Sequence, residues 1–205
     1  MKITALEAQK HNKDRLNVYL DGEFAFGLDI NTAARLRIGQ ILSEAEIAEL
    51  QKTDGVARAF ERAVRFLAAR PRSVYEVRRK LQEKQTPPST IDTVLERLTA
   101  LGYVDDLAFA RTWVENRQTF RPRSTAALRA ELKAKGVEEA IIRQVLHEVD
   151  NSESALQLAR QQVGRWRGED SYTLRQKLSS YLIRRGYDYD TVRAATDIVI
   201  EELEE

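Results

Sequence analysis

Residues 132–149 read LKAKGVEEAIIRQVLHEV, and the same pattern recurs at residues 81–98 (LQEKQTPPSTIDTVLERL) and at residues 182–199 (LIRRGYDYDTVRAATDIV). The copies are 51 and 50 residues apart, and each begins with leucine. A period of this size is typical of one supersecondary unit copied in tandem, in which each copy buries its apolar side partly against the next. The sequence therefore predicts a helical repeat array, which suits binding along an extended partner and leaves little room for a deep catalytic pocket.

Turn residues between the copies predict three helices in each repeat. In the first repeat, a helix over residues 56–69 carries apolar residues at helical spacing and ends before Pro71. Ser73 caps a second helix, and a Pro-Pro pair separates it from a third helix over residues 90–101. The Pro-x-Ser spacing of the first repeat recurs at Pro122 in the second.

The chain ahead of the repeats predicts a small β structure. Residues 3–28 roughly alternate apolar and polar residues, and Asp21-Gly22 is a strong signal for a hairpin turn. Ser43 and Glu46 form a capping box that opens a helix ending near residue 52. We therefore predict a mainly α chain with a β-hairpin or three-stranded meander and a short helix at residues 1–54, and three-helix repeats at residues 55–104, 105–151 and 152–205.

Composition narrows the class of protein. The chain has 205 residues, of which 42% are hydrophobic and 32% are charged, and its net charge is +1. It has no cysteine, which excludes disulfides, cysteine-ligated zinc and thiol catalysis. No apolar run approaches the roughly 18 residues of a membrane span, and the N-terminus lacks the apolar core of a signal peptide. We expect a soluble, cytoplasmic protein.

Catalytic signatures are nearly absent from the sequence. The two histidines, His11 and His147, stand without a nucleophile motif, and no glycine-rich nucleotide fingerprint occurs. Asp105-Asp106 is interpreted as a helix cap rather than a magnesium site. The sequence therefore predicts a protein that is not an enzyme and that needs no cofactor or metal.

Basic residues gather in each repeat despite the low net charge. Residues 55–85 contain nine basic and three acidic residues, residues 117–135 six and one, and residues 160–186 seven and two. One interpretation is a solvated helix surface, and the other is a recurrent stripe that meets phosphates or an acidic protein. We expect the following residues to make such contacts: Arg72, Arg78, Arg79, Lys80, Arg121, Arg123, Arg129 and Lys133.

Aromatic residues could add base stacking to such a surface. Trp166, flanked by glycine and arginine, is the strongest candidate, whereas Trp113 and Tyr172 are expected in the core.

Three segments contain motifs of a known family. Residues 72–81, RSVYEVRRKL, resemble the family stretch R-S-x-x-E-L/V-x-x-K-L. Residues 101–110, LGYVDDLAFA, are similar to its G-Y-I/V/L-x-D-x-x-F/Y-A segment, and residues 131–137, ELKAKGV, resemble its E-L-x-x-K-G-I/V. The family that these segments resemble is RecX, whose members regulate the RecA recombinase, and the match covers residues 56–187. Gln85 and Arg121 stand where the family has glycine, which bears on local turn geometry, and the N-terminal hairpin has no counterpart in this match.

The resemblance implies a function as well as a fold. It implies three tandem three-helix repeats in an elongated, curved array that binds the RecA–DNA filament and reduces its ATPase and strand-exchange activities. The expected setting is DNA recombination, DNA repair and the SOS response, and the expected partners are the RecA filament and single-stranded DNA. We expect a monomer.

Two other classes of protein stay open. One is a stand-alone DNA-binding protein of helical-repeat type, although the predicted third helix at residues 90–101 is poor in the Arg, Asn and Gln of a recognition helix. The other is a scaffold for another protein, in which the basic residues serve only solubility.

Overall fold

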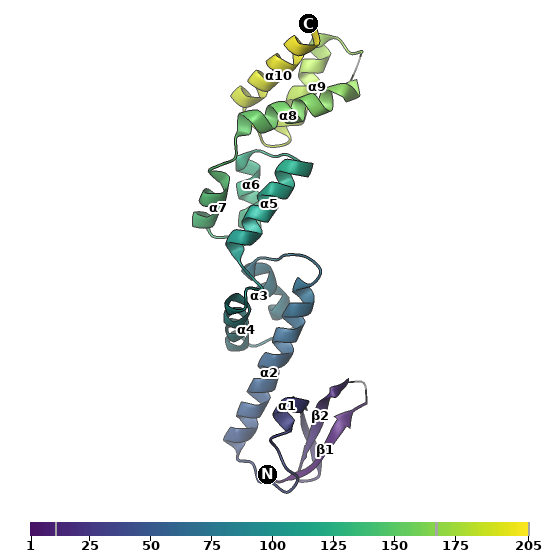
Figure 1. The fold of residues 1–205 in the computed structure, drawn as a ribbon, viewed down its shortest axis with the longest axis vertical. Helices are drawn as coiled ribbons and strands as arrows, with labels where there is room; N and C mark the ends of the chain where they lie inside the picture. The colour runs from purple at the N-terminus through teal and green to yellow at the C-terminus, as the bar shows by residue number, and fades with distance from the viewer. Residues whose placement is uncertain (11, 167, 205) are drawn as a thin grey trace. The chain divides into compact units, whose positions relative to one another are not determined.

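The computed structural model describes residues 1–10, 12–166 and 168–204, so His11, Arg167 and Glu205 lie outside the described residues. The chain divides into two compact units. Unit 1 comprises Met1–Pro71 and Val77–Val104, and unit 2 comprises Arg72–Glu76 and Asp105–Glu205. Within the described residues the fold is mainly helical with one small antiparallel sheet, as the sequence predicts (Figure 1).

The N-terminal sheet is the predicted three-stranded meander. Its strands are β1 (Ile3–Gln9), β2 (Asn12–Leu20) and β3 (Glu23–Asp29), in the order β1-β2-β3. Asp21 and Gly22 both have positive φ, at 50° and 94°, which is the conformation that the hairpin turn requires. One side of the sheet packs on α1 (Ile30–Ala33) and on the start of α2. The fully buried residues Ile3, Val18 and Leu28 lie on this side.

Helix α2 (Glu44–Leu67) is continuous, whereas the sequence predicted two helices that meet near Gly55. The predicted capping box opens it, because Ser43 accepts from the Glu46 amide while the Glu46 carboxylate accepts from Ser43. Glycine inside a helix costs only about 1 kcal/mol relative to alanine, so Gly55 alone does not end one. The preceding Asp54 is buried and bound to Arg15 of β2 at 2.8 Å, and this contact ties the helix to the sheet.

The second part of α2 packs with α3 (Val74–Gln82) and α4 (Pro88–Ala100) in unit 1. The residues buried in this group include Val77, Leu81, Ile91, Val94 and Leu98. After α3 the chain turns through Gln85, whose φ is 54°. Gly136 and Gly186 have φ of 72° and 92° at the matching places, so glutamine here adopts the left-handed conformation that glycine adopts in the other two repeats.

Unit 2 contains two further three-helix groups (Figure 1). The first consists of α5 (Asp106–Phe120), α6 (Thr125–Ala134) and α7 (Glu139–Leu146), packed around residues such as Leu128, Leu132 and Ile142. The second consists of α8 (Asn151–Val163), a 3-10 turn (Gly164–Trp166), α9 (Ser171–Ile183) and α10 (Tyr189–Glu204). Its core includes Leu158, Leu178, Leu182, Val192 and Val199.

The start of α3 belongs to unit 2 and explains two of the recurrent motifs. The Ser73 hydroxyl donates to the Lys135 carbonyl at 2.6 Å, and the Val74 amide donates to Asp106 Oδ1 at 2.8 Å. Glu76 adds an ion pair with the Lys135 amine at 3.0 Å. The Pro-x-Ser and Lys-Gly segments of neighbouring repeats are therefore the two sides of one contact.

The same contact recurs between the second and third repeats. The Ser124 amide donates to the Arg185 carbonyl at 3.3 Å, and the Thr125 amide donates to Asn151 Oδ1 at 2.9 Å. In both contacts, the first amide of a second helix is bound by a short side chain at the start of the next first helix. The repeat period of the sequence thus reflects a repeated joint as well as a repeated core.

Candidate functional site

The basic residues of α3 are mostly engaged within the chain. Arg78 pairs with Asp92 of α4 at 2.7 Å, and Arg79 and Lys80 both pair with Glu83, at 3.6 and 3.2 Å. The Arg79 side chain is 67% exposed, so its pair is solvent-screened. These three cations therefore each have an acidic partner within the same repeat.

Helix α6 has the same arrangement. Arg129 and Lys133 share one carboxylate, Glu139 at the start of α7, and the Lys133–Glu139 distance is 3.1 Å. The hydrogen bond from Lys133, aided by the charge of Arg129, holds the pKa of Glu139 below its ordinary value. The recurrent basic second helix is thus matched by acidic residues on the third helix of the same repeat.

The corner between α5 and α6 is different, because two arginines and a tryptophan share a single carboxylate there. Arg117 and Arg123 pair with Glu131 at 2.7 and 3.1 Å, and Glu131 also accepts from the indole nitrogen of Trp113 at 2.8 Å. Arg121 is exposed and has no ion pair in the described part of the chain. Of the eight predicted contact residues, Arg121 is therefore the most available to bind an anion of a partner.

Arg72, the remaining predicted residue, is half-buried beside Ser73 in unit 2. The structure therefore places Arg72, Arg121, Arg123, Arg129 and Lys133 in unit 2 and the other three in unit 1, and it describes no single surface for all eight.

A second group of arginines adjoins the α5–α6 corner. The hydrogen bond from the Ser124 amide to the Arg185 carbonyl brings the end of α9 to the loop that carries Arg121 and Arg123. Arg184 is exposed without an ion pair among the described residues, and Arg185 lies 4.9 Å over the Tyr181 ring. The segments that carry these arginines thus lie side by side at this corner, although they form separate basic clusters in the sequence.

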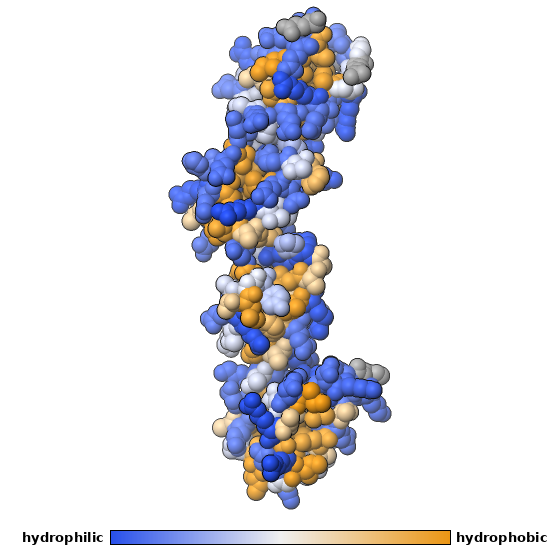
Figure 2. Space-filling model, viewed as in Figure 1, coloured by the Kyte–Doolittle hydropathy of each residue, from blue (hydrophilic) through white to orange (hydrophobic). Residues whose placement is uncertain are grey.

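Among the described residues of the repeats, all of the unpaired cations except Arg121 lie outside the predicted set. Within the described residues of the repeats, the cations with neither an ion pair nor an aromatic partner are Arg58, Arg62, Lys84, Arg111, Arg121, Arg143, Arg165 and Arg184. These cations are unpaired because no described acidic residue of a neighbouring helix lies close enough to them. Recognising them from the sequence would require knowing which helices face each other. Figure 2 shows hydrophilic residues over much of the viewed face of the repeats.

The aromatic candidates turn out differently from one another. Trp166 is half-buried and packs edge-on against Tyr181, with ring centroids 6.2 Å apart. Trp113 packs on its repeat core, as predicted. Tyr172 is 70% exposed, so its expected place in the core is wrong, because the buried side of α9 runs through Leu174 and Leu178.

Two open hollows lie in unit 2, of about 510 Å³ between α5 and α7 and about 500 Å³ beside α8. The described residues that line them include no His, Ser or Cys. Among residues 1–10, 12–166 and 168–204, no three His, Cys, Asp or Glu side chains could together hold a metal ion. No helix of the described chain is long and apolar enough to cross a bilayer.

The predicted helix cap at the start of α5 is confirmed. Asp105 accepts from the amides of Leu107 and Ala108, and Asp106 accepts from the Val74 amide. Burial raises the pKa of Asp106, and the hydrogen bond from Val74 opposes this. Both carboxylates thus accept hydrogen bonds from backbone amides. His147, the histidine within the described residues, is exposed.

Four family models match the chain in order. They are the regulatory protein RecX N-terminal domain at residues 1–43, and the first, second and third three-helix domains of RecX at residues 59–98, 105–146 and 148–196. The N-terminal sheet is therefore a family feature, although the sequence resemblance found no counterpart for it.

Relatives and solved structures agree with these matches. "Regulatory protein RecX" of Listeria welshimeri is 31% identical over the whole chain and 78% of that relative, and the protein of that name from Bacillus velezensis is 34% identical over 95% and 76%. A crystal structure of regulatory protein RecX matches 96% of this chain and 98% of its own, with a TM-score of 0.72 and 29% identity. RecX from Lactobacillus salivarius shares the fold over 74% of this chain, with a TM-score of 0.62 and 21% identity. The chain belongs to the RecX family of regulatory proteins.

Proposed function

We propose that this chain regulates the RecA recombinase by binding the RecA–DNA filament and inhibiting its ATPase and strand-exchange activities, without catalysing a reaction itself. The observation that carries the proposal is the match along the whole chain to proteins named regulatory protein RecX. The activity would modulate DNA recombination and repair. We further propose that the chain acts in the cytoplasm, as a monomer.

The proposed contacts to the filament are electrostatic. They involve Arg72, Arg78, Arg79, Lys80, Arg121, Arg123, Arg129 and Lys133. Most of these cations already have a carboxylate partner, but exposed ion pairs are worth only about 0–1 kcal/mol, so a phosphate can replace the carboxylate at low cost. The Arg79 and Lys133 side chains, 67% and 58% exposed, are accessible to such exchange.

The α5–α6 corner is the strongest of these contact sites. Arg121 needs to give up no ion pair to meet a phosphate, and Arg184 of the adjoining α9 end has the same property within the described residues. Cations that neutralise phosphates release condensed counterions, so binding through this corner should weaken steeply as salt rises. Direct contact of the corner with single-stranded DNA, inside or outside the filament, is part of the proposal.

The test is the DNA-dependent ATPase rate of RecA from the same organism, measured at fixed single-stranded DNA and salt while the chain is titrated. Inhibition at well below one chain per RecA subunit is expected, together with slower strand exchange. An unchanged ATPase rate with retained binding to bare DNA would favour the stand-alone DNA-binding protein. An unchanged rate without DNA binding would leave the scaffold.

A further inference from the structure

The third helices of the three repeats differ in length. Helix α4 has 13 residues and α10 has 16, whereas α7 has only 8. The first helix of the middle repeat, α5, is not shortened, because it has 15 residues and its counterpart in the third repeat, α8, has 13. Helix α7 is therefore roughly one and a half turns shorter than α4 and about two turns shorter than α10, and the last half of α5 is left without that cover.

The third repeat shows what the additional turns do. Glu202, in the last turns of α10, pairs with Arg160 on the last half of α8 through a bidentate contact. Ile200, two residues earlier, is 5% exposed in the core of the repeat. These turns therefore combine an aliphatic anchor with a charge that meets its opposite on the first helix.

The middle repeat has the complementary half of this arrangement. Helices α5 and α8 align on their capping residues, Asp105 and Asp150, and this alignment places Glu115 where α8 has Arg160. No described residue forms an ion pair with Glu115. The charge on the first helix is thus reversed, and the helical turns that would carry its partner are missing.

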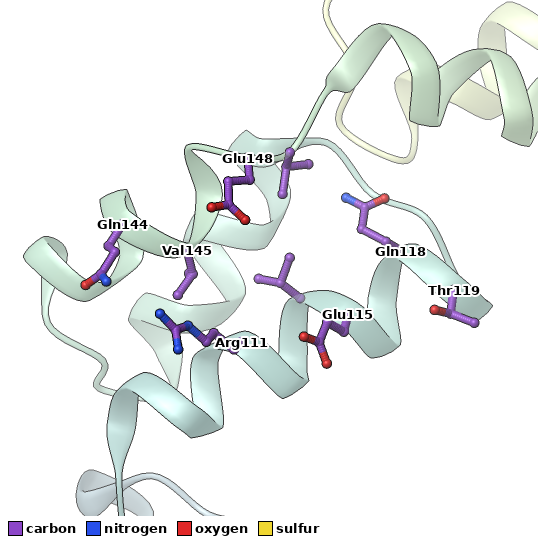
Figure 3. Close-up of a pocket in the computed structure, with 9 residues that line it drawn as sticks. Arg111, Glu115, Gln118, Thr119, Gln144, Val145 and Glu148 are labelled. Carbon is purple, nitrogen blue, oxygen red and sulfur yellow. The ribbon is translucent and has the colours of Figure 1, made fainter.

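A groove of about 510 Å³ lies at this place, between α5 and α7 (Figure 3). Its apolar lining is Val114, Val145 and Val149, and its polar lining includes two carboxylates and one guanidinium that have no ion pair with any described residue: Glu115, Glu148 and Arg111. Figure 3 shows Arg111 of α5 and Val145 of α7 pointing toward one another across the groove.

We propose that this groove docks a helical segment of the recombinase protein in the filament, of about two turns and thus roughly 11 Å long. The segment would present an aliphatic side chain to the three valines and a Lys or Arg, within one turn of it, to Glu115 and Glu148. It would take the place that the last turns of α10 have in the third repeat. The inference rests on the proposed function, because it names a protein contact within the same filament.

The lining favours a protein helix over nucleic acid. Glu115 and Glu148 would repel phosphates, and the residues that line the groove include no aromatic ring on which a base could stack. The groove would therefore bind the recombinase protein, while the α5–α6 corner would bind phosphates.

The test is site-specific photocross-linking. The full chain carries a benzophenone amino acid in place of Gln144, which is exposed at the groove, and is irradiated with the recombinase assembled on single-stranded DNA. The control carries it in place of Ala194, the exposed matching residue of α10, where the helix is complete. A cross-link from Gln144 to a recombinase helix with an aliphatic residue and a Lys or Arg within one turn is expected, and a weaker cross-link from Ala194.

Charge reversal gives an independent measurement. Glu115→Lys with Glu148→Lys should weaken filament binding about tenfold, because two attractive pairs become repulsive. Glu96→Lys with Glu201→Lys changes the net charge equally at exposed residues that also lack an ion pair among the described residues, and it should strengthen or leave unchanged the binding.

Several outcomes would overturn the inference. They are cross-links from Gln144 only to DNA, only to a second copy of the chain, or to nothing, while the wild-type chain still inhibits the recombinase. Equal weakening by both charge-reversal pairs would also overturn it. If the wild-type chain neither binds the filament nor inhibits it, the proposed function fails and the inference falls with it.

Discussion

Tyr75 lies directly against Gly136, so that a Cβ atom added to the glycine would stand 2.3 Å from the Tyr75 Cβ. Gly186 has the same relationship to Ser124, whose hydroxyl would be 2.8 Å from an added Cβ. Both glycines also have positive φ. The glycine after each of these second helices is therefore required twice, by the left-handed turn and by the close approach of the preceding repeat.

Gly136→Ala should destabilise unit 2 by about 2–4 kcal/mol, because it combines left-handed strain of about 1–2 kcal/mol with a steric overlap at Tyr75. Gly102→Ala is the matched control, since φ is 71° there and no described atom lies within 4 Å of an added Cβ. Urea unfolding should show a loss of only about 1–2 kcal/mol for the control. Equal losses for the two variants would mean that the Tyr75 contact does not constrain the joint.

Gln85→Gly should stabilise unit 1 by about 1 kcal/mol, because the φ of 54° at Gln85 is strained for any residue with a Cβ. Gln82→Gly, at the end of α3, should have the opposite effect by a similar amount, since glycine lowers helix stability. Thermal unfolding of the two variants checks both signs. A lower melting temperature for Gln85→Gly would show that glutamine makes a compensating contact.

The sequence predicted the repeats, the sheet and most helix caps because these depend on local patterns. The repeat period, the hairpin turn and the Ser or Asp caps each depend on residues that are close in the sequence. Even the unusual Gln85 could be recognised as a departure from the glycine expected there. The continuous α2 was missed because the helix-breaking effect of Gly55 was overestimated. Glycine destabilises a helix by only about 1 kcal/mol, and the buried residues on either side of Gly55 stabilise α2 by more than that.

The candidate site was less predictable, because it depends on which helices face each other. Arg78 and Arg129 were expected to contact a partner, and the structure shows that each also pairs with an acid on the third helix of its own repeat. The groove follows from the short α7, whose signal was present in the sequence. The third helices α4 and α7 begin 51 residues apart, whereas the next caps, Asp105 and Asp150, are only 45 residues apart.

Glu131→Ala should lower stability and raise DNA affinity at once. The carboxylate is largely buried. It accepts hydrogen bonds from Arg117 and from the Trp113 indole and pairs with Arg123, so its loss removes two hydrogen bonds and an ion pair at a cost of about 1–3 kcal/mol. The two released arginines would then be available to phosphates, and DNA binding should tighten at low salt. Chemical unfolding and fluorescence anisotropy with single-stranded DNA measure the two effects. Unchanged DNA affinity in the folded variant would argue against the α5–α6 corner as a phosphate contact.

Arg121→Glu should weaken binding to the filament and to single-stranded DNA, and it should lower the salt dependence of log K by about one phosphate contact. Because Arg121 has no ion pair among the described residues, its replacement should leave stability nearly unchanged. Arg143→Glu makes the same charge change at another exposed, unpaired arginine, on α7, outside the predicted set. Equal losses of affinity for both variants would show that net charge, rather than the corner, determines binding.

Asp106→Asn should stabilise the chain at neutral pH and flatten its stability profile in mild acid. Burial raises the pKa of Asp106 above that of the unfolded chain, so the folded state binds the proton more tightly. The penalty of this carboxylate is therefore absent below the unfolded pKa and grows as pH rises through the folded pKa. Asparagine keeps the acceptor for the Val74 amide without the charge, as Asn151 does for Thr125 in the next repeat.

The reverse exchange, Asn151→Asp, is the natural control for this prediction. It should add a similar penalty at neutral pH, and it also removes the bond that the Asn151 amide donates to the Thr125 hydroxyl at 3.0 Å. Urea unfolding between about pH 4 and pH 7 follows both variants, in a window that starts near the ordinary pKa of aspartate. If Asp106→Asn destabilises the chain at pH 7, the carboxylate charge itself must strengthen the bond to Val74 by more than its burial costs.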